Sequence, residues 1–297
     1  MSTSQGRPHP PWMERPGPAM RLAKGIALTV VVALVLFPMW TVVATSVADP
    51  QEVIENGGWV VWPGHWSFAA YADVLRGGIV TRALMVSGLV TLVGTTLSLC
   101  CTIGLAYALS RPRLYGGRFL LLLVLFTFLF PPGMVPLFLV VRSVGLFDQY
   151  AALVLPFLVN VFNLVVMRGF FQSLPTEVME AARVDGAGEF TILRRIVLPL
   201  SKPVVAVVGL FYAVAYWNRF FEAIIYFNDQ SRWPIGTVLR QYVIGGAALS
   251  ESADATAASP QSVQMAVVVL ATAPIVCLYP FLQRYFVKGV LTGALKA

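Results

Sequence analysis

The chain has 297 residues, of which 58% are hydrophobic and only 12% are charged, and its mean hydropathy is +0.76. An average soluble domain has roughly 25% charged residues, so this composition excludes an ordinary water-soluble enzyme and predicts a protein of the lipid bilayer. The formal net charge of +7 does not require a nucleic-acid partner, because basic residues gather on the cytoplasmic side of membrane proteins.

The chain opens with a polar segment and continues with long apolar stretches. Residues 1–20 contain five prolines and two glycines, which is typical of a disordered cytoplasmic tail. A helix needs about 20 mostly apolar residues to cross a hydrocarbon core of ~30 Å. Six stretches approach or exceed that length, and they are 22–47, 80–109, 119–141, 150–167, 203–227 and 263–282. The sequence therefore predicts an all-α membrane protein with six transmembrane helices in a domain over 21–284, followed by a cytoplasmic tail over 285–297.

Two of these stretches have special features. The first is too long for a removable signal peptide and lacks a small-residue cleavage pattern, so we expect a retained helix. The third contains Pro131, Pro132, Gly133 and Pro136, which interrupt the backbone hydrogen bonds of a helix. We expect this helix to kink or split where protein or water covers the freed backbone groups.

The distribution of basic residues predicts the orientation. If the N-terminus is cytoplasmic, 15 of the 21 Lys and Arg residues fall on the cytoplasmic side and six on the other. Both termini are therefore predicted to be cytoplasmic. The connection 228–262 is then an outer loop, and 168–202 is the one long cytoplasmic connection between spans.

The sequence offers little for metal or nucleotide chemistry. Cys100, Cys101 and Cys277 lie inside spans, and His9 and His65 are isolated, so no metal site is predicted. A G-x-x-x-x-G-K-[ST] stretch is absent from the sequence, so we expect no nucleotide or other cofactor bound through this motif in this chain. Any ATP that powers the protein must then be hydrolysed by a separate subunit.

The cytoplasmic connection 168–202 has the pattern of a helix, a turn and a second helix. Ser173 is placed to cap the first helix, Pro175 can occupy its first turn, and the helix should end near Asp185. Gly186 permits the positive φ angle of a sharp turn. The second helix is predicted over 189–198 and should end at Pro199. Its expected apolar face consists of Phe190, Leu193, Ile196 and Val197.

Seven residues of this connection resemble the EAA loop of ATP-binding cassette (ABC) importer permeases, E-A-A-x3-G-x9-I-x-L-P. They are Glu180, Ala181, Ala182, Gly186, Ile196, Leu198 and Pro199. The resemblance implies the type I importer permease fold and identifies the first helix, which ends at Asp185, as a coupling helix that docks on an ATPase subunit. The residues suit this role, because paired alanines allow a close approach and Glu180 offers a carboxylate to a partner's arginine.

Other stretches resemble the carbohydrate branch of this family. They are VVWPGHWSFAAYADVL, LPLSKPVVAV, AYWNRFFEAIIYF and the ending YPFLQRYFVKGVLTGALKA. These stretches are similar to permeases for complex oligosaccharides, including lipo-oligosaccharide, aldouronate and alginate importers. The resemblance implies a non-enzymatic subunit of the bacterial cytoplasmic (inner) membrane. Its partners would be a second permease subunit, identical or different, two ABC subunits that hold ATP and magnesium, and an extracytoplasmic sugar-binding protein, which residues 245–259 would contact.

Candidates for the sugar path lie in the fourth and fifth spans. At 1.5 Å per residue Tyr212 lies ~14 Å beyond residue 203, Tyr216 lies one turn further, and Arg219 follows on the same stripe. Asn160 and Asn163 are three residues apart and are expected to share a helix face. Alternatives stay open: the asparagines could join helices by hydrogen bonds, and Arg219 could anchor the outer interface instead of attracting an acidic cargo.

Other functions fit the sequence less well. An ion-coupled secondary transporter or an intramembrane enzyme would need carboxylates or histidines inside the spans, and the sequence places almost all of them in loops. An ABC permease for another cargo class, such as peptides, remains an alternative. The prediction is thus a permease subunit that forms half of the path for an oligosaccharide, with acidic cargo of the alginate or aldouronate type as the finer hypothesis.

Overall fold

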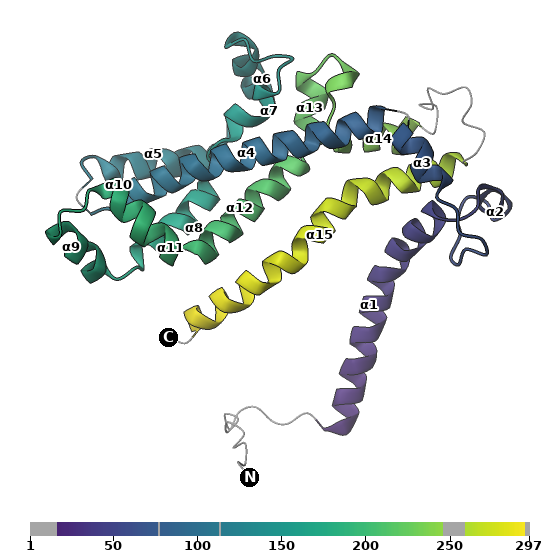
Figure 1. The fold of residues 1–297 in the computed structure, drawn as a ribbon, viewed down its shortest axis with the longest axis horizontal. Helices are drawn as coiled ribbons and strands as arrows, with labels where there is room; N and C mark the ends of the chain where they lie inside the picture. Colours follow the sequence, from purple (N-terminus) through teal and green to yellow (C-terminus); the bar gives the residue numbers. More distant parts are fainter. Residues whose placement is uncertain (1–16, 77, 113, 246–258, 295–297) are drawn as a thin grey trace.

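The protein is helical throughout the residues that the computed structural model describes, which are 17–76, 78–112, 114–245 and 259–294 (Figure 1). Within these ranges the extended pairing is a single antiparallel bridge between Ala48 and Trp66. The first part of the chain forms α1 (Pro18–Ser46), α2 (Pro50–Glu55), α3 (Ala69–Arg76), α4 (Ile79–Ser110), α5 (Gly117–Leu129), α6 (Met134–Ser143) and α7 (Ala151–Val154). The second part forms α8 (Val161–Gln172), α9 (Thr176–Val184), α10 (Glu189–Ile192), α11 (Leu198–Leu200), α12 (Lys202–Trp217), α13 (Phe220–Tyr226), α14 (Ile235–Gly245) and α15 (Pro260–Ala294).

The described helices can account for six membrane spans. Three apolar segments are individually long enough to cross a bilayer, namely α1, α4 and the part of α15 over Pro260–Leu278. Three further spans arise if each strongly bent helix pair counts as one. The total of up to six agrees with the six predicted spans, although half of them are broken.

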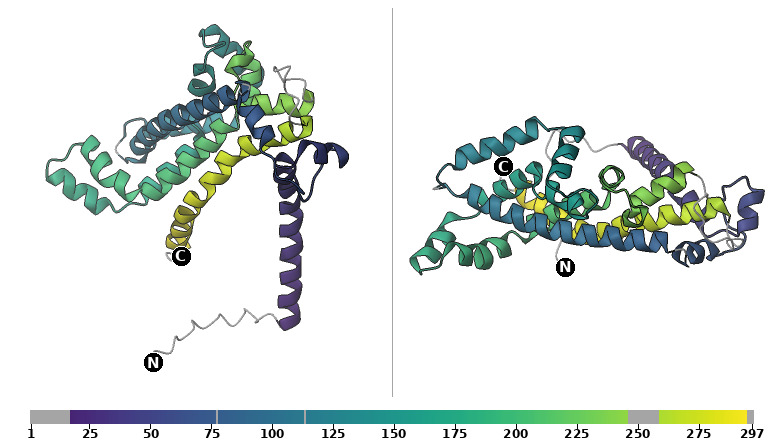
Figure 2. Two further views of the ribbon diagram at one scale, coloured as in Figure 1. Left: turned by 45° about the vertical axis from the view of Figure 1, so that its right-hand side comes forward. Right: turned by 90° about the horizontal axis from the view of Figure 1, so that it is seen from above.

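Helix α4 forms the axis of the bundle. Figure 1 shows α12 and α8 running along α4, with α15 crossing beneath them, and Figure 2 shows α1 standing away from the bundle along most of its length. Helix α1 packs against α15 near the C-terminal end of α1, where Thr41, Ala44, Thr45 and Ser46 are buried. The remainder of α1 exposes large apolar side chains, as expected of a surface that faces lipid or another subunit.

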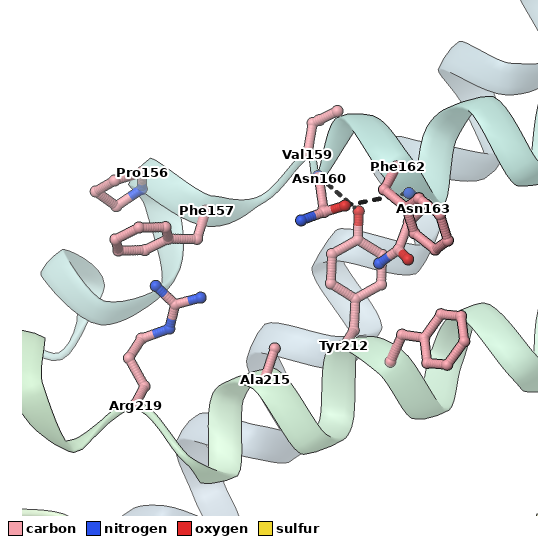
Figure 3. Close-up of a pocket in the computed structure, with 10 residues that line it drawn as sticks. Pro156, Phe157, Val159, Asn160, Phe162, Asn163, Tyr212, Ala215 and Arg219 are labelled. Atoms are coloured by element: carbon pink, nitrogen blue, oxygen red, sulfur yellow. Dashed lines mark hydrogen bonds between the residues drawn. The ribbon is translucent and has the colours of Figure 1, made fainter. Parts of the chain in front are cut away.

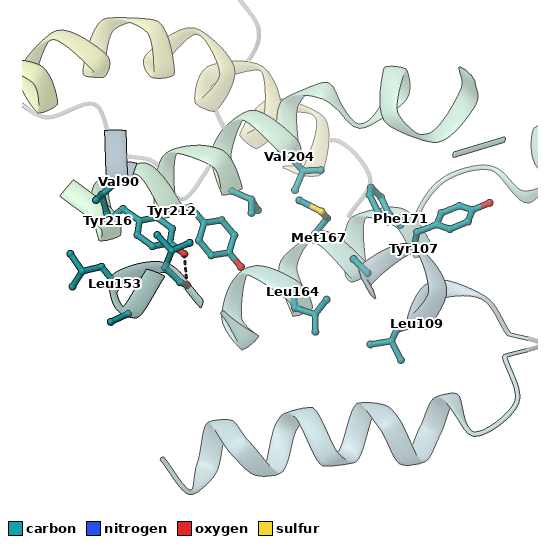
Figure 4. Close-up of a cluster of buried hydrophobic side chains, with 14 of the residues drawn as sticks. Val90, Tyr107, Leu109, Leu153, Leu164, Met167, Phe171, Val204, Tyr212 and Tyr216 are labelled. Carbon is teal, nitrogen blue, oxygen red and sulfur yellow. Dashed lines mark hydrogen bonds between the residues drawn. The ribbon is translucent and has the colours of Figure 1, made fainter. Parts of the chain in front are cut away.

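The hydrophobic core lies where α4, α8 and α12 meet (Figure 4). Leu153, Leu164, Met167 and Val208 are fully buried there. Two glycines bring α4 and α12 close together: Gly94 lies under the ring of Tyr216, and Gly209 faces a leucine of α4.

The third span splits at its prolines, as predicted. Helix α5 ends at Leu129, α6 begins at Met134, and the two are bent by 117°. Pro131 and Pro132 have no N–H to donate, and Gly133 adopts a φ of 77°, so a continuous helix cannot form. Both physical reasons could be read from the sequence.

The two connections predicted to lie on the outer side contain short helices instead of being loops throughout. Helices α2 and α3 lie within 48–79, and α14 lies inside the predicted loop 228–262 with Ile235, Val238 and Tyr242 buried. The backbone N–H of Ile235 donates to Ser87 Oγ at 2.8 Å, which fastens α14 to α4. The expected contact stretch 245–259 falls almost entirely on residues 246–258, outside the described residues.

The first and last helices extend beyond the predicted domain boundaries, which were residues 21 and 284. Helix α1 begins at Pro18, before the expected start at residue 21, and α15 continues to Ala294 across the expected tail from 285. Residues 1–16 and 295–297 of the predicted tails lie outside the described residues.

Candidate functional site

Two tyrosines of α12 face α4. The Tyr212 hydroxyl shares a hydrogen bond with Thr102 Oγ1 at 2.7 Å, and the Tyr216 hydroxyl shares one with Ser98 Oγ at 2.8 Å. The two rings lie on one helix face because i and i+4 positions coincide, and all four side chains are buried. Tyr216 therefore belongs to the packed seam between the helices.

The fourth span breaks at Asn160. A 3₁₀ turn over Leu155–Phe157 precedes α8, and the two parts of the span are bent by 48°. Asn160 caps α8, with its Oδ1 accepting from the N–H of Asn163 at 3.1 Å, while its own N–H donates to the Tyr212 hydroxyl at 2.9 Å. The expectation that both asparagines lie on one continuous helix face was wrong, because Asn160 is the cap that starts the helix.

The fifth span also breaks, and this break determines the position of Arg219. Helix α12 ends at Trp217, α13 starts at Phe220, and Arg219 lies between them with a ψ of 60°. The predicted helical stripe from Tyr216 to Arg219 is therefore interrupted. The Arg219 guanidinium stacks on the Phe157 ring at 3.5 Å and forms an ion pair with Glu222 at 3.2 Å.

Four of the five predicted path residues line one cavity of about 340 Å³ (Figure 3). They are Asn160, Asn163, Tyr212 and Arg219. Aromatic rings from Phe157, Phe162 and Phe211 complete its walls. In Figure 3 Arg219 lies at one end, below Phe157, and Asn163 lies toward the other. The volume is at the lower end of the range for small-molecule sites.

A second cavity of about 410 Å³ lies across Phe157 from the first. Both cavities are lined by Pro156 and Phe157, but the second contains Glu222 where the first contains Arg219. Its far wall is the split at Pro131–Gly133 in the third span. The ion pair between Arg219 and Glu222 thus lies between the two cavities. The side chain of Arg219 is 11% exposed, and its Nε has no hydrogen-bond partner among the described residues.

The predicted coupling helix is α9, with a different start. Pro175 is its N-terminal flanking residue, and Ser173 instead ends α8, where its hydroxyl donates to the Phe170 carbonyl at 2.8 Å. The predicted cap at Ser173 was wrong because α8 extends further than expected. Asp185 ends the helix, and Gly186 has a φ of 82°, as the predicted turn requires.

The EAA residues present an open surface. Glu180 and Ala181 are exposed, Ala182 is half-buried, and Glu180 forms no ion pair or hydrogen bond with any residue that the structure describes. The carboxylate is therefore available to a partner.

The second helix of the connection continues through Pro199, contrary to prediction. Residues 189–200 are helical throughout, with a π-helical segment over Leu193–Val197 just before the proline. A proline ring collides with the carbonyl four residues earlier, and the wider π turn gives it room. Ile192 and Val197 are buried whereas Phe190 is exposed, so the apolar face is rotated from the predicted one.

Three functional candidates were missed by sequence reasoning. Ser98 and Thr102 hold the tyrosines, and Glu189 accepts hydrogen bonds from Arg183 and Tyr107. A signal for the first two existed: Gly94, Ser98 and Thr102 recur every four residues, which places small and hydroxyl groups on one face of α4. Glu189 gave no such signal, since two of its partners, Tyr107 and Arg111, are distant in the chain.

Comparisons with known proteins agree with this architecture. The family model described as "Binding-protein-dependent transport system inner membrane component" matches residues 101–292. The chain is 42% identical to the polygalacturonan/rhamnogalacturonan transport system permease protein YtcP of Bacillus subtilis, over 88% of this chain and 92% of that one. It is also 42% identical to the protein LplC of Bacillus subtilis, over 89% and 90% of the two chains.

A solved structure has the same fold. It is a chain of a bacterial ABC transporter involved in the import of the acidic polysaccharide alginate, with a TM-score of 0.85 and 28% sequence identity. The match covers 93% of this chain and 100% of that chain.

Proposed function

Because the chain belongs to the family of inner membrane components of binding-protein-dependent transport systems, and is a permease subunit of a sugar ABC importer, we propose that its cargo is an acidic oligosaccharide. Arg219 carries this proposal. It is a largely buried cation that lines a cavity beside amide and aromatic groups. A neutral sugar needs no buried cation, whereas a uronate carboxylate gains charge-assisted hydrogen bonds from one.

The cavity around Arg219 has the chemistry that an acidic sugar needs. The amides of Asn160 and Asn163 can exchange hydrogen bonds with hydroxyl groups, and the ring of Phe162 can contact the C–H face of a sugar. Arg219 uses one nitrogen on Glu222, and a guanidinium has five donors in a planar fork. The guanidinium donors that Glu222 does not use leave capacity for a carboxylate of the cargo.

The relatives support this substrate class. The alginate importer is named for an acidic polysaccharide, and YtcP is named for polygalacturonan and rhamnogalacturonan. Each name describes that protein, and the buried cation is the independent reason for extending the class to this chain.

The coupling to ATP is assigned to α9. In this proposal the helix with Glu180, Ala181, Ala182 and Asp185 docks on an ATPase subunit, two of which hold ATP and magnesium. A second permease subunit completes the path, an extracytoplasmic sugar-binding protein delivers the cargo, and both termini are cytoplasmic. The exposed, unpartnered carboxylate of Glu180 supports the docking role, because a surface that waits for a partner leaves its charged groups free.

The substrate proposal is tested by Arg219→Gln in the whole transporter, with uptake of acidic and neutral oligosaccharides of equal length measured in reconstituted vesicles. We expect acidic uptake to fall about tenfold or more, because a hydrogen bond to a charged group is worth about 1.5–3 kcal/mol, with neutral uptake little changed. Arg142→Gln is the matched control, since Arg142 is an exposed arginine on the predicted outer side. An equal loss for both cargo types, or no loss, would refute the role of Arg219.

The coupling role is tested separately by Glu180→Lys. The variant should lose co-purification with the ATPase subunit while the membrane subunits still associate, because the new cation repels the partner's arginine. Glu55→Lys reverses an exposed charge at the end of α2, on the predicted outer side, and should leave ATPase binding intact. Normal binding and uptake in Glu180→Lys would rule out the docking role of this carboxylate.

A further inference from the structure

Four side chains meet at the cytoplasmic end of α4 and form what we name the Glu189 cluster: Tyr107, Arg111, Arg183 and Glu189. Arg183 on α9 donates from Nε and from a terminal nitrogen to Glu189 Oε1, at 3.0 and 2.9 Å. The Tyr107 hydroxyl on α4 donates to the other carboxylate oxygen. Arg111, just after α4, has its Nε 3.7 Å from that same oxygen. One carboxylate thus joins α4 to α9.

Arg111 adds a second connection between the same two helices. Its guanidinium lies 4.1 Å from the centre of the Tyr107 ring, and its terminal nitrogen is 3.0 Å from the sulfur of Met179 on α9. Stacking on Tyr107 fixes the guanidinium, and its contact with Met179 brings α9 against α4.

Apolar packing alone holds α9 weakly. It has nine residues, and Met179 is its buried side chain. A helix this short is marginal unless tertiary contacts support it, so its direction depends on the polar contacts around it. If α9 could change its orientation freely, movement of the docked ATPase subunit would not be transmitted to the membrane helices.

We propose that Glu189 is a positioning residue that ties the coupling helix α9 to the cytoplasmic end of α4, so that the two move as one body. This inference rests on the docking role of α9 proposed above. Movement of α9 would then be passed along α4 to Thr102 and Ser98, which hold Tyr212 and Tyr216. Because the Tyr212 hydroxyl also binds the N–H of Asn160, the connection ends at the wall of the cavity.

The exposure of the cluster determines what its loss should do. The Glu189 side chain is 55% exposed, and ion pairs in water contribute little to overall stability. Substitution should therefore leave the fold and the subunit assembly intact while it loosens the angle between α9 and α4. A loss of coupling without a loss of folding is the signature of positioning.

The experiment uses the complete transporter with Glu189→Gln, Glu189→Asp and Glu189→Ala. Spin labels are placed at Tyr115→Cys and Val184→Cys, two exposed positions beside α4 and on α9, after replacement of Cys100, Cys101 and Cys277. The distance distribution between the labels and the sugar transported per ATP hydrolysed are measured together. Glu177→Gln, on the exposed face of α9, is the control for the distance.

We expect Glu189→Gln and Glu189→Ala to broaden the label distance and to lower transport per ATP at least twofold, with Glu189→Asp intermediate and Glu177→Gln unchanged. Arg183→Gln should reproduce Glu189→Gln. An unchanged distance in Glu189→Gln, or no recovery in Glu189→Asp relative to Glu189→Ala, would overturn the proposal. The label distance reports the connection itself, whereas the Glu180→Lys binding assay reports docking, so failure of either is recognised separately.

Discussion

The close approach of α4 and α12 predicts that Gly94→Ala destabilises the protein. A Cβ atom on Gly94 would lie 2.8 Å from Cε1 and Cζ of the Tyr216 ring and 2.9 Å from Cδ1. These distances are far below ordinary van der Waals contact. The ring cannot swing aside without a cost, because it is buried and its hydroxyl shares a hydrogen bond with Ser98.

The size of the effect follows from three opposing contributions. Overpacking a core costs about 1–3 kcal/mol, and loss of the Ser98 hydrogen bond costs about 0.5–1.5 kcal/mol more. Replacing a glycine within a helix by alanine returns about 0.5–1 kcal/mol. The free energy of unfolding of Gly94→Ala should therefore fall by about 0.5–4 kcal/mol, with a central value of about 2 kcal/mol.

The assay is the unfolding of the purified transporter in detergent, compared with Gly104→Ala. Gly104 lies on the same helix, and a Cβ atom there would meet no atom within 4 Å. Gly104→Ala should be neutral or slightly stabilising, because only the helix-propensity contribution applies. If Gly94→Ala proved as stable as Gly104→Ala, the tight seam between α4 and α12 would be refuted.

Three further predictions concern the helix breaks and the Glu189 cluster. Asn160→Ser should keep the cap of α8 and the stability of the protein, whereas Asn160→Ala should lower the free energy of thermal unfolding by about 1 kcal/mol. Both substitutions should lower sugar uptake if the amide serves the path, and full uptake in Asn160→Ser would exclude that role. Trp217→Phe removes the donor to the Ala271 carbonyl at 2.9 Å and should cost about 1 kcal/mol. Trp59→Phe, at an exposed tryptophan, is the control for the assay, and an unchanged melting temperature in Trp217→Phe would contradict this prediction. The Tyr107 hydrogen bond, aided by Arg183 and Arg111, holds the pKa of Glu189 below its usual value near 4.3. The distance between the spin labels should therefore stay constant from pH 8 to about pH 5 and broaden only when acid protonates the carboxylate. Broadening near neutral pH would contradict the direction of this shift.

The sequence predicted those features that depend on local chemistry. Pro131 and Pro132 split the third span because proline has no N–H, and Gly186 forms the turn after α9 because it tolerates positive φ. The residues of the EAA motif are likewise close together in the chain, and the docking role that the motif implies for α9 stays a prediction. Four of the five residues predicted for the sugar path also line one cavity.

Features that depend on contacts between distant segments could not be predicted. The break between α12 and α13 places Arg219 against Phe157 and Glu222, and the helical count from residue 203 assumed one unbroken helix. Asn160 looked like half of a polar helix face, but the bend after the 3₁₀ turn makes it a cap. Glu189 finds partners 82 and 78 residues earlier in Tyr107 and Arg111, and periodicity carries no information about such pairs.

The isolation of α1 has a consequence for the biogenesis of the protein. Apart from the interruption at Pro38, this unsplit helix of 29 residues pairs its interior backbone groups within itself, without help from the later helices. It can therefore enter the bilayer as an independent anchor and fix the direction of threading. The third to fifth spans are broken and leave carbonyl and N–H groups that only neighbouring helices can cover. The unbroken helices α1 and α4 thus precede the three broken spans in the chain, so the broken spans are made beside helices that can already be in the membrane, and the unbroken part of α15 follows them.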